Sequence, residues 1–452
     1  MAELIDRLHV NLTHLPAATA YWVAYSGGMD SHVLLHAMAA LARGGRCTSV
    51  RAIHVNHQLS LNAQRWADHC VRRCAELGVA CRVEAVDATP RGGESREAAA
   101  RHARYAALTQ ILDEGEAVLT AQHLQDQAET LLLQLIRGAG VRGLSAMGAV
   151  RPLGSGWLGR PLLGEARSEL HRYARMHALD WIDDPTNFDT SLERNFIRHE
   201  VLPVLEQRRP AVCRALSRSA QHLAEAGELL DELARSDLAT TRGTRPGTLS
   251  ISALHRLTPA RQRNVLRTWL DEHSVRMPDR RRLLRIQQEV IPARADATPV
   301  VAWGAVQVRR HRDDLHVLTG SHVEPEPRTY PWPHLNQPLP LPQKGMQLRV
   351  VTAAPGEAGI DPVWLATQSI SVRFRHGGER CRLQAGGVAR TLKKLLQEWD
   401  VPSWERSSIP LIYAGDTLVA VAGHCICAGS APALGVGGVR VEVERLEGEF
   451  GR

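Results

Sequence analysis

Strand-like and helix-like patterns alternate along the first 150 residues, and this alternation restricts the fold more than any other feature of the chain. Four short apolar runs each precede a segment with helical periodicity. The runs cover 21–25, 50–55, 81–86 and 117–121, and the helical segments lie near 30–42, 62–77, 95–113 and 125–137. The pattern predicts an α/β fold, with a parallel sheet between two layers of helices and ligands at the carboxyl ends of its strands.

A glycine-rich turn of sequence SGGMDS follows the first apolar run. A turn of this kind at a helix N-terminus presents backbone N–H groups and the positive end of the helix dipole to an anion. Its glycines let a phosphate approach the backbone, its serines add hydroxyl donors, and Asp30 can hold Mg²⁺ or its water. The alternative is a small-residue turn that Asp30 caps. The turn predicts a nucleotide site at Ser26, Gly27, Gly28, Met29, Asp30 and Ser31.

Arginine supplies nearly all of the positive charge. Lys and Arg total 55 against 48 Asp and Glu, which gives a net charge of +7. The lysines are Lys344, Lys393 and Lys394. The absence of lysine before them excludes a Walker A loop or a lysine Schiff base in the first three quarters of the chain. The positive balance favours a polyanionic partner such as nucleic acid.

The cysteines and the hydropathy pattern indicate the cellular compartment of the chain. Eight cysteines in 452 residues do not make a disulfide framework. Cys70 and Cys74 have helical spacing, which favours one buried face over a redox pair. No run approaches the roughly 18 to 20 apolar residues of a membrane span, and the N-terminal segment has no apolar signal core. We expect a cytoplasmic chain with reduced thiols, with metal or sulfur chemistry as the alternative for them.

Several segments resemble known proteins. SGGMDS in its strand-to-helix setting resembles the pyrophosphate loop (PP-loop) of the ATP pyrophosphatase superfamily, whose members split ATP into AMP and pyrophosphate to activate a substrate oxygen. Within it, later motifs resemble the long form of the tRNA(Ile)-lysidine synthetase family. They are HVNHQLS at 54–60, the helix with Glu97, Arg101, Arg104 and Tyr105, QHLQDQAET at 122–130, Arg194-Asn195-x-Ile197-Arg198, and the C-terminal stretches at 372–383 and 392–413.

The resemblance implies a ligase that joins L-lysine to C2 of the wobble cytidine of a tRNA(Ile) with a CAU anticodon. It implies ATP and Mg²⁺ as cofactors, an adenylated tRNA intermediate, and release of AMP and pyrophosphate. A homodimer is left open. The implied domains are a PP-loop ATP-binding catalytic domain, a helical arginine-rich domain for substrate or tRNA, a proline-rich linker and a small α+β tRNA-binding domain, at 1–215, 216–323, 324–345 and 346–452.

The resemblance also implies the site residues. Asp126 and Glu129 begin the helix at 125–137 on one face, at the same sheet edge as the glycine turn. They are expected to coordinate Mg²⁺ or to receive the lysine ammonium, or alternatively to complement the helix dipole. The catalytic set is Asp30, Asp126, Glu129 and Arg194; His54 joins the glycine turn in binding the nucleotide, and Asp30 and Asp126 hold the metal.

Some residues leave other interpretations open. Gln122 and Gln125 stand where the family usually has histidine and aspartate, which favours a non-catalytic tRNA-binding protein with a decayed ATP site as one alternative. His54 and Arg194 could instead be a satisfied polar group and part of a solvated helix face. A tRNA-thiolating enzyme would need sulfur-relaying cysteines, for which Cys70, Cys74 and Cys81 are the candidates.

The last hundred residues carry a second set of candidates, for tRNA phosphates. Between 371 and 410 eight basic residues stand against four acidic ones, and two lysines share one expected helix. A generic basic surface is the alternative. Trp399 and Trp404 are candidates for base stacking, with structural packing as the alternative.

Overall fold

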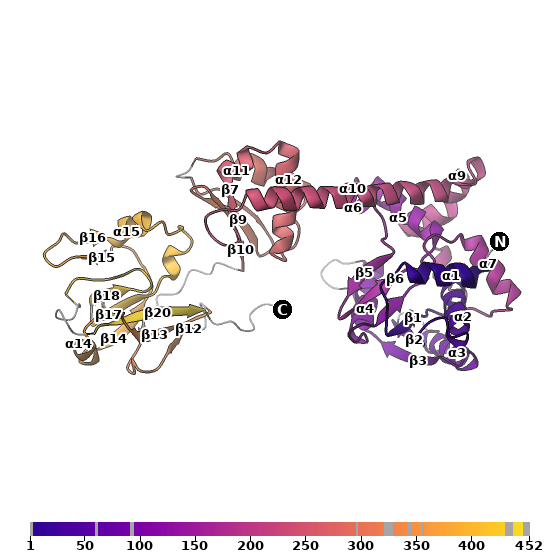
Figure 1. The fold of residues 1–452 in the computed structure, drawn as a ribbon, viewed down its shortest axis with the longest axis horizontal. Coiled ribbons are helices and arrows are strands. Elements are labelled where there is room, and N and C mark those ends of the chain that lie inside the picture. Colours follow the sequence, from indigo (N-terminus) through magenta and orange to yellow (C-terminus); the bar gives the residue numbers. More distant parts are fainter. Residues whose placement is uncertain are drawn as a thin grey trace. The chain divides into compact units, whose positions relative to one another are not determined.

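The computed structural model describes residues 3–58, 62–90, 95–294, 297–320, 329–341, 345–354, 357–429 and 437–445 (Figure 1). Leu59 and Ser60 of the HVNHQLS motif lie outside these ranges. The chain forms two compact units, Met1–Ser236 and Asp237–Arg452, and their boundary falls within one long helix, α10 (Val212–Thr240).

The first unit is built on one six-stranded sheet with the order β3-β2-β1-β4-β6-β5. Neighbouring strands are parallel except for β5, which runs antiparallel to β6. The strands are β1 (Ala20–Ala24), β2 (Ser49–Asn56), β3 (Ala80–Ala85), β4 (Ala117–Leu119), β5 (Val150–Leu153) and β6 (Gly156–Gly159). The helices are α1 (Leu4–Thr13), α2 (Met29–Arg43), α3 (Ala63–Glu76), α4 (Arg96–Gln110), α5 (Leu124–Ile136), α6 (Val141–Leu144), α7 (Arg167–Met176), α8 (Glu193–Phe196) and α9 (Leu202–Arg208).

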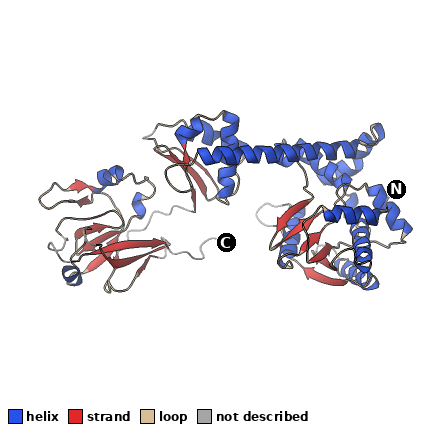
Figure 2. Ribbon diagram, in the orientation of Figure 1, coloured by secondary structure: helices blue, strands red, loops and turns tan. Residues whose placement is uncertain are grey.

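Helices cover both faces of this sheet, as the alternating pattern predicts (Figures 1 and 2). On one face α1, α2, α3 and α7 bury a large core that includes Val33, Leu34 and Cys74. On the other face α4 packs Leu108 against Ile53 of β2 and residues of neighbouring strands. The expected parallel-sheet fold is therefore confirmed, and the carboxyl ends of β1, β2 and β4 lie at one sheet edge.

A separate small hydrophobic core packs the segment 197–202 against α5. Leu124 and Ala128 of α5 pack against Ile197 and Leu202. Ile197 starts a short π-helical turn, Ile197–Val201, directly after α8. The apolar contact holds the polar residues of this turn beside the first turns of α5, although some 70 residues separate them in sequence.

The expected helical region opens the second unit and also contains an antiparallel sheet with the order β7-β10-β9-β8. Its strands are β7 (Leu249–Ser250), β8 (Val300–Trp303), β9 (Val306–His311) and β10 (Asp314–Thr319). Its helices after α10 are α11 (Ile251–His255), α12 (Pro259–Glu272) and α13 (Arg280–Arg285), followed by a π-helical turn, Ile286–Val290. They enclose a core centred on Trp269, which is fully buried.

The rest of the second unit has three antiparallel sheets, with the orders β11-β14-β17-β18-β19, β12-β13-β20 and β15-β16. The strands are β11 (Tyr330–Pro331), β12 (Leu339–Leu341), β13 (Met346–Thr352), β14 (Ile370–Arg373), β15 (Arg380–Cys381), β16 (Arg390–Thr391), β17 (Leu411–Ala414), β18 (Thr417–Val421), β19 (Cys425–Ile426) and β20 (Val439–Arg445). The helices are α14 (Pro362–Ala366) and α15 (Leu392–Glu398). This α+β character is the expected one.

The proline-rich segment expected as a linker differs from that expectation where the structure describes it. It contributes β11 and β12, and it buries Trp332 and Leu341 in the C-terminal core. Each of the two strands lies at the edge of its sheet, so a proline there costs no bond on the outer side. Proline content therefore did not distinguish an edge strand from a linker.

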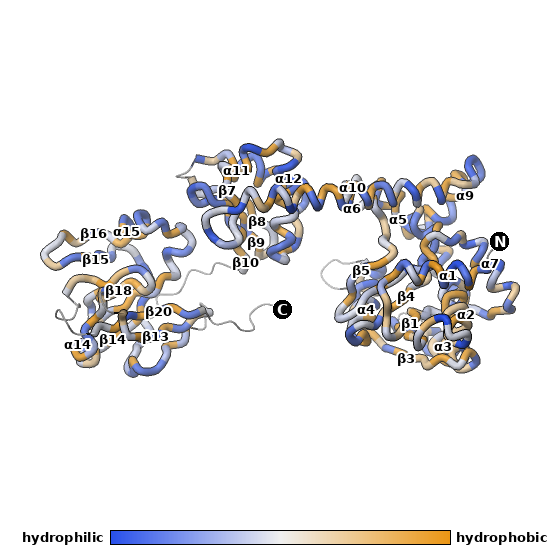
Figure 3. The backbone as a smooth tube through the Cα atoms, viewed as in Figure 1, coloured by the Kyte–Doolittle hydropathy of each residue, from blue (hydrophilic) through white to orange (hydrophobic). Residues whose placement is uncertain are grey.

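Hydropathy along the backbone agrees with this architecture. Hydrophobic and hydrophilic residues alternate along α10, as expected for a helix with one packed face (Figure 3). None of the helices in the described ranges combines the length and the apolar character of a membrane span.

Candidate active site

The glycine turn joins β1 to α2 in one defined conformation. Gly27 has a φ of +88°, and a Cβ atom there would lie 2.8 Å from Ile182 Cδ1. The Ser31 hydroxyl donates to the Gly28 carbonyl at 2.9 Å and lies 3.0 Å from the Ser26 hydroxyl. Because α2 begins at Met29, the N–H groups of its first turn lack acceptors within the helix. The turn thus has the features that bind an anion.

Two carboxylates from different helices converge on one imidazole nitrogen beside this turn. His123 Nε2 lies 3.6 Å from Asp30 Oδ2 and 3.4 Å from Asp126 Oδ2. Arg167 Nε lies 4.0 Å from the other oxygen of Asp30. That oxygen is buried, and it has no hydrogen-bond partner in the described part of the chain. The structure therefore brings together the two acids predicted as metal ligands.

Asp126 also caps α5. Its Oδ2 atom accepts a hydrogen bond of 3.0 Å from the backbone N–H of His123, the N-cap residue. The capping alternative therefore describes a real contact of Asp126, which it makes in addition to its contacts with charged side chains. Glu129 accepts its hydrogen bonds from arginines instead.

Asp126 and Glu129 form an ion-pair network with Arg194 and Arg198. Arg194 donates to Glu129 at 2.9 Å and to Asp126 at 3.0 Å. Arg198 donates to Glu129 at 2.6 and 2.9 Å and to Asp126 at 3.0 Å. Glu129 is fully buried. The network neutralises two acids with two guanidinium groups, so Glu129 is held by arginines and is not open to a substrate ammonium.

The charges around Asp126 keep it ionised. Burial raises the pKa of Asp126, but His123, Arg194 and Arg198 lower it, and the net direction is downward. A carboxylate with a depressed pKa is a good electrostatic partner for a cation and a weak proton acceptor.

A cavity of about 730 Å³ opens beside the glycine turn, within the range of small-molecule sites. Its wall includes Ser26, Asp30, His54, Asp126 and Arg194, and so combines phosphate-binding, metal-binding and cationic candidates. Met29, by contrast, is buried in the large core below. The remaining polar and aromatic wall comes mainly from the end of β2 and from α3 and α4, at Asn56, His57, Trp66, Glu97, Arg101, Arg104 and Tyr105.

His54 and His57 are neutral donors or acceptors in this wall. His54 Nδ1 lies 3.0 Å from the Tyr25 carbonyl oxygen, and burial lowers the pKa of His54. Burial and the nearby Arg104 lower the pKa of His57 to about 4. Arg104 Nε donates to His57 Nε2 at 3.4 Å, which fits an unprotonated nitrogen. His54 is therefore both a satisfied polar group and a cavity-lining residue.

The two glutamines that depart from the family pattern have defined partners. Thr120 donates to the side-chain oxygen of Gln122, which lines the cavity. Gln125 accepts a hydrogen bond of 3.0 Å from the backbone N–H of Arg167, the first residue of α7. An amide at Gln125 therefore supports a helix N-terminus without adding negative charge beside Asp126.

Sequence reasoning missed the part played by His123 and by α4. His123 carries part of the QHLQDQAET resemblance without an assigned role, and its Nε2 atom lies between Asp30 and Asp126. Glu97, Arg101 and Arg104 carry the resemblance without an assigned role, and they line the cavity. Their spacing of four and three residues on one helix face was the available signal.

The cysteines near the turn are packed away from solvent. Cys70 and Cys74 are fully buried in the core beneath α2 and α3, as their spacing predicts. A sulfur-relaying pair has to be reached by its donor and its substrate. The burial of these two argues against the thiolating alternative, although the third candidate, Cys81, is only half-buried.

Some basic residues of the C-terminal part lie beside acidic side chains, and others do not. Arg373 lies 3.2 Å from Asp416, and Arg375 lies 3.7 Å from Glu379. Lys393 and Lys394 are exposed on α15, on the face opposite its buried leucines, and no acidic partner lies within salt-bridge distance among the described residues. The lysines are therefore the better candidates for phosphate contacts.

The two tryptophans proposed for base stacking pack against protein. Trp399 stacks on His424 with a centroid distance of 5.3 Å. Trp404 is buried and contacts His311 and His316 edge to face. The packing alternative describes both residues.

A parallel sheet, a glycine turn at a helix N-terminus and a cavity at the strand ends define a PP-loop ATP-binding protein, and the PP-loop domain model matches residues 3–205. The models of the TilS substrate-binding domain and the TilS substrate C-terminal domain match residues 249–316 and 370–443. The chain belongs to the tRNA(Ile)-lysidine synthase family.

Similarity to curated members runs over nearly the whole chain. The chain is 44% identical to tRNA(Ile)-lysidine synthase of Coxiella burnetii over 94% of its own length and 93% of that protein. Identity to the synthase of Alkalilimnicola ehrlichii is 45%, over 92% of each chain. For Pseudomonas putida it is 41%, over 91% of this chain and 94% of the relative.

Proposed function

We propose that this chain uses ATP to join L-lysine to C2 of the wobble cytidine of a tRNA(Ile) with a CAU anticodon, forming lysidine. One observation carries the chemistry. The glycine turn, Asp30 and Asp126 meet at a single cavity, with His123 between the two carboxylates. Family membership supplies the substrate and the product.

The first half-reaction converts a poor leaving group into a good one. The C2 oxygen of cytidine attacks the α-phosphorus of ATP, the bond from that phosphorus to the bridging oxygen breaks, and pyrophosphate leaves. The N–H groups at the start of α2 donate hydrogen bonds to the departing pyrophosphate and so stabilise its negative charge. This step needs positioning and charge neutralisation and no protein nucleophile.

The second half-reaction forms the carbon–nitrogen bond. The ε-ammonium of lysine first loses one proton to solvent; its unprotonated nitrogen attacks C2, the C2–O bond breaks, and AMP leaves with the electron pair of that bond. The nitrogen then loses its remaining extra proton to solvent. Asp126 attracts the incoming lysine ammonium electrostatically before it loses that proton, and Arg194, which borders the cavity, is the cationic candidate to contact the phosphate of the adenylate. Arg194 and Arg198 keep Asp126 ionised for this task.

The residues beside the turn fit Mg²⁺. Asp30 and Asp126 offer carboxylate oxygens, the ligands that this hard cation prefers, and one buried oxygen of Asp30 lacks a hydrogen-bond partner in the described part of the chain. When bound there, Mg²⁺ neutralises phosphate charge. We further propose a cytoplasmic location, and a homodimer remains a prediction.

The mass of the wobble nucleoside tests this proposal. The protein is incubated with ATP, L-lysine and a tRNA(Ile) transcript with a CAU anticodon, and the tRNA is then digested. We expect a nucleoside heavier than cytidine by one lysine less one water, and none when ATP or lysine is omitted. A sulfur-containing product would establish a thiolase instead, and an unchanged cytidine would establish a non-catalytic binder.

A further inference from the structure

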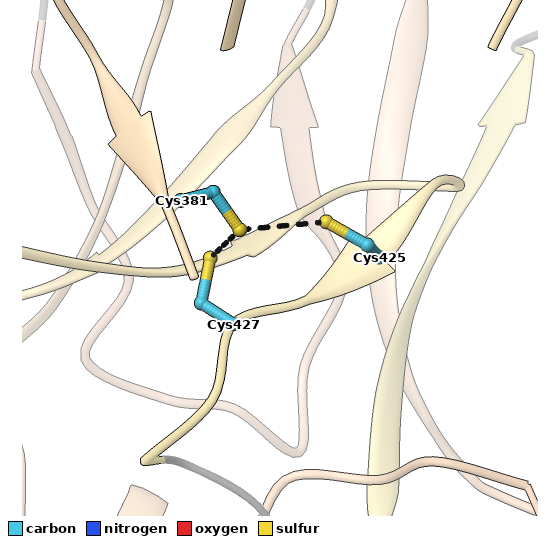
Figure 4. Close-up of side chains that lie close together, drawn as sticks. All are labelled: Cys381, Cys425 and Cys427. Carbon is cyan, nitrogen blue, oxygen red and sulfur yellow. Dashed lines mark hydrogen bonds between the residues drawn. The ribbon is translucent and has the colours of Figure 1, made fainter. Parts of the chain in front are cut away.

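Three cysteines of the second unit bring their sulfur atoms together (Figure 4). Cys381 ends β15, Cys425 begins β19, and Cys427 follows that strand. The Sγ atom of Cys381 lies 3.8 Å from that of Cys425 and 2.6 Å from that of Cys427. All three sulfur atoms lie within 4.8 Å of one another.

Backbone hydrogen bonds bring these segments together without help from the sulfur atoms. Cys425 pairs with Val421 of β18, and the N–H of Cys427 donates to the carbonyl of Val419 at 2.8 Å. The N–H of Ala428 donates to the carbonyl of Arg382 at 2.6 Å. The last bond joins the residue after Cys427 to the residue after Cys381, so the sheet itself sets the three side chains against each other.

Apolar packing accounts for only part of this arrangement. Cys381 and Cys427 are almost fully buried, and they share a small cluster with Leu395 of α15. Nonbonded heavy atoms rest about 3.5 to 4.0 Å apart, whereas two of these sulfur atoms are 2.6 Å apart. A disulfide would use two of the three sulfur atoms and leave the third beside it. Three converging sulfur atoms match the donor set of a thiophilic cation.

We propose that Cys381, Cys425 and Cys427 form a three-thiolate binding site for Zn²⁺. Zinc–sulfur bonds of about 2.3 Å at tetrahedral angles place sulfur atoms roughly 3.8 Å apart. The Cys381 and Cys425 sulfur atoms already have that separation. The Cys427 sulfur has to move outward by about 1 Å, a shift within reach of a χ1 adjustment.

The three cysteines differ in burial. Cys425 is half-buried and lines a surface cavity of about 490 Å³, whereas the other two sulfur ligands lie behind it. A zinc ion with three protein ligands takes a water molecule in the fourth position. The ion would join β15 to the edge strand β19, and through Leu395 it would support α15, which carries Lys393 and Lys394. The site would therefore stabilise this part of the fold, and it is separate from the ATP cavity.

Zinc stoichiometry of the full chain tests the site. The reduced protein is stripped with a chelator and titrated with Zn²⁺ alone, and bound metal is measured by atomic emission. We expect about one ion per chain, a melting temperature that rises on loading, and at least a roughly tenfold loss of affinity in Cys425→Ser. Cys425 is the half-buried ligand, so its serine variant keeps the fold. Cys47→Ser, which alters a half-buried thiol of the first unit, is the matched control and should bind zinc as the parent does.

Cobalt provides a second readout that does not depend on the variants. Co²⁺ bound to the stripped parent chain should show thiolate charge-transfer absorption, and this absorption should be lost in Cys425→Ser. Equal zinc binding by the parent and Cys425→Ser would overturn the proposal. A Cys381–Cys427 disulfide in the isolated chain, with no zinc or cobalt uptake after reduction, would also overturn it and establish a redox pair.

Discussion

Gly27 sets the backbone conformation of the glycine turn, and its neighbour Gly28 provides a matched control. With φ at +88° and Ile182 Cδ1 only 2.8 Å from an added Cβ, Gly27→Ala should cost about 1–3 kcal/mol of stability. Gly28 has an ordinary φ of −75°, and an added Cβ would meet nothing closer than 3.5 Å. Gly28→Ala should therefore stay within about 0.5 kcal/mol of the parent while weakening ATP binding. Thermal unfolding and ATP titration measure both. Equal stability of the two variants would show that a side chain at position 27 causes no strain.

Asp126 makes the stability of the first unit depend on pH in a defined window. Its pKa is lowered from 3.8, so its stabilising effect is full above that value and is lost as pH falls towards the lower folded-state pKa. Asp126→Asn should cost on the order of 1–3 kcal/mol at neutral pH because Arg194 and Arg198 lose an anionic partner. Urea unfolding should give a constant difference between pH 7 and about 5, and a shrinking one below about 4. A difference that already shrinks between pH 7 and 5 would mean that the pKa is raised.

Local sequence revealed only part of the site. Asp30 and Asp126 were predicted because each follows a strand that ends at the same sheet edge. The network around Glu129 was not predictable in the same way. Its partners lie 65 and 69 residues further along the chain, and they reach it because Ile197 and Leu202 pack on α5. No local periodicity encodes that contact, and so the arginine partners of Glu129 were not predicted.

At the scale of elements, α15 carries two exposed lysines without an acidic partner among the described residues, whereas Arg373 and Arg375 lie beside acidic side chains. Lys393→Ala with Lys394→Ala should weaken tRNA binding and lower the slope of log affinity against log salt by roughly two, one for each lysine that neutralises a phosphate. Arg373→Ala should lower it less, because Arg373 lies beside Asp416 and over the Tyr413 ring. Filter binding at several salt concentrations compares the variants. Equal slopes for the lysine pair and the parent would remove α15 from the tRNA surface.

The elements themselves were predictable where the hydrophobic pattern is strong. β1 to β4 and α2 to α5 fall within a few residues of their expected ranges, because each strand is an apolar run and each helix has a clear period. β5 and β6 were missed because they are four residues each and contain or flank glycine and proline. β11 and β12 lie where the prolines predict a linker, because pairing at a sheet edge leaves no periodic signal in two or three residues.

For the whole molecule, the separate core of the C-terminal sheets predicts that nucleotide and tRNA binding can be separated. Residues 321–452 are the part to delete, since β11 and β12 belong to the C-terminal core and a cut at 345 would leave Trp332 without its packing partners. The shortened chain should bind ATP as the full chain does, because the glycine turn and its cavity lie within Met1–Ser236. Its tRNA affinity should fall and depend less on salt. Unchanged tRNA affinity at every salt concentration would assign the C-terminal part a structural role.

We propose that the SGGMDS turn and Asp30 promote adenylation of the tRNA, with release of pyrophosphate, before lysine takes part. A single-turnover reaction with ATP labelled at the α-phosphate and tRNA(Ile), without lysine, tests it most directly. We expect label to appear on the tRNA as pyrophosphate is released, and lysine then to discharge it as AMP. Asp30→Asn should fold normally and lower the rate of labelling by at least roughly tenfold, since it removes a charge that we propose to hold Mg²⁺. Label that never enters the tRNA would contradict the adenylated intermediate. Label that enters it equally fast with Asp30→Asn would contradict the role of Asp30.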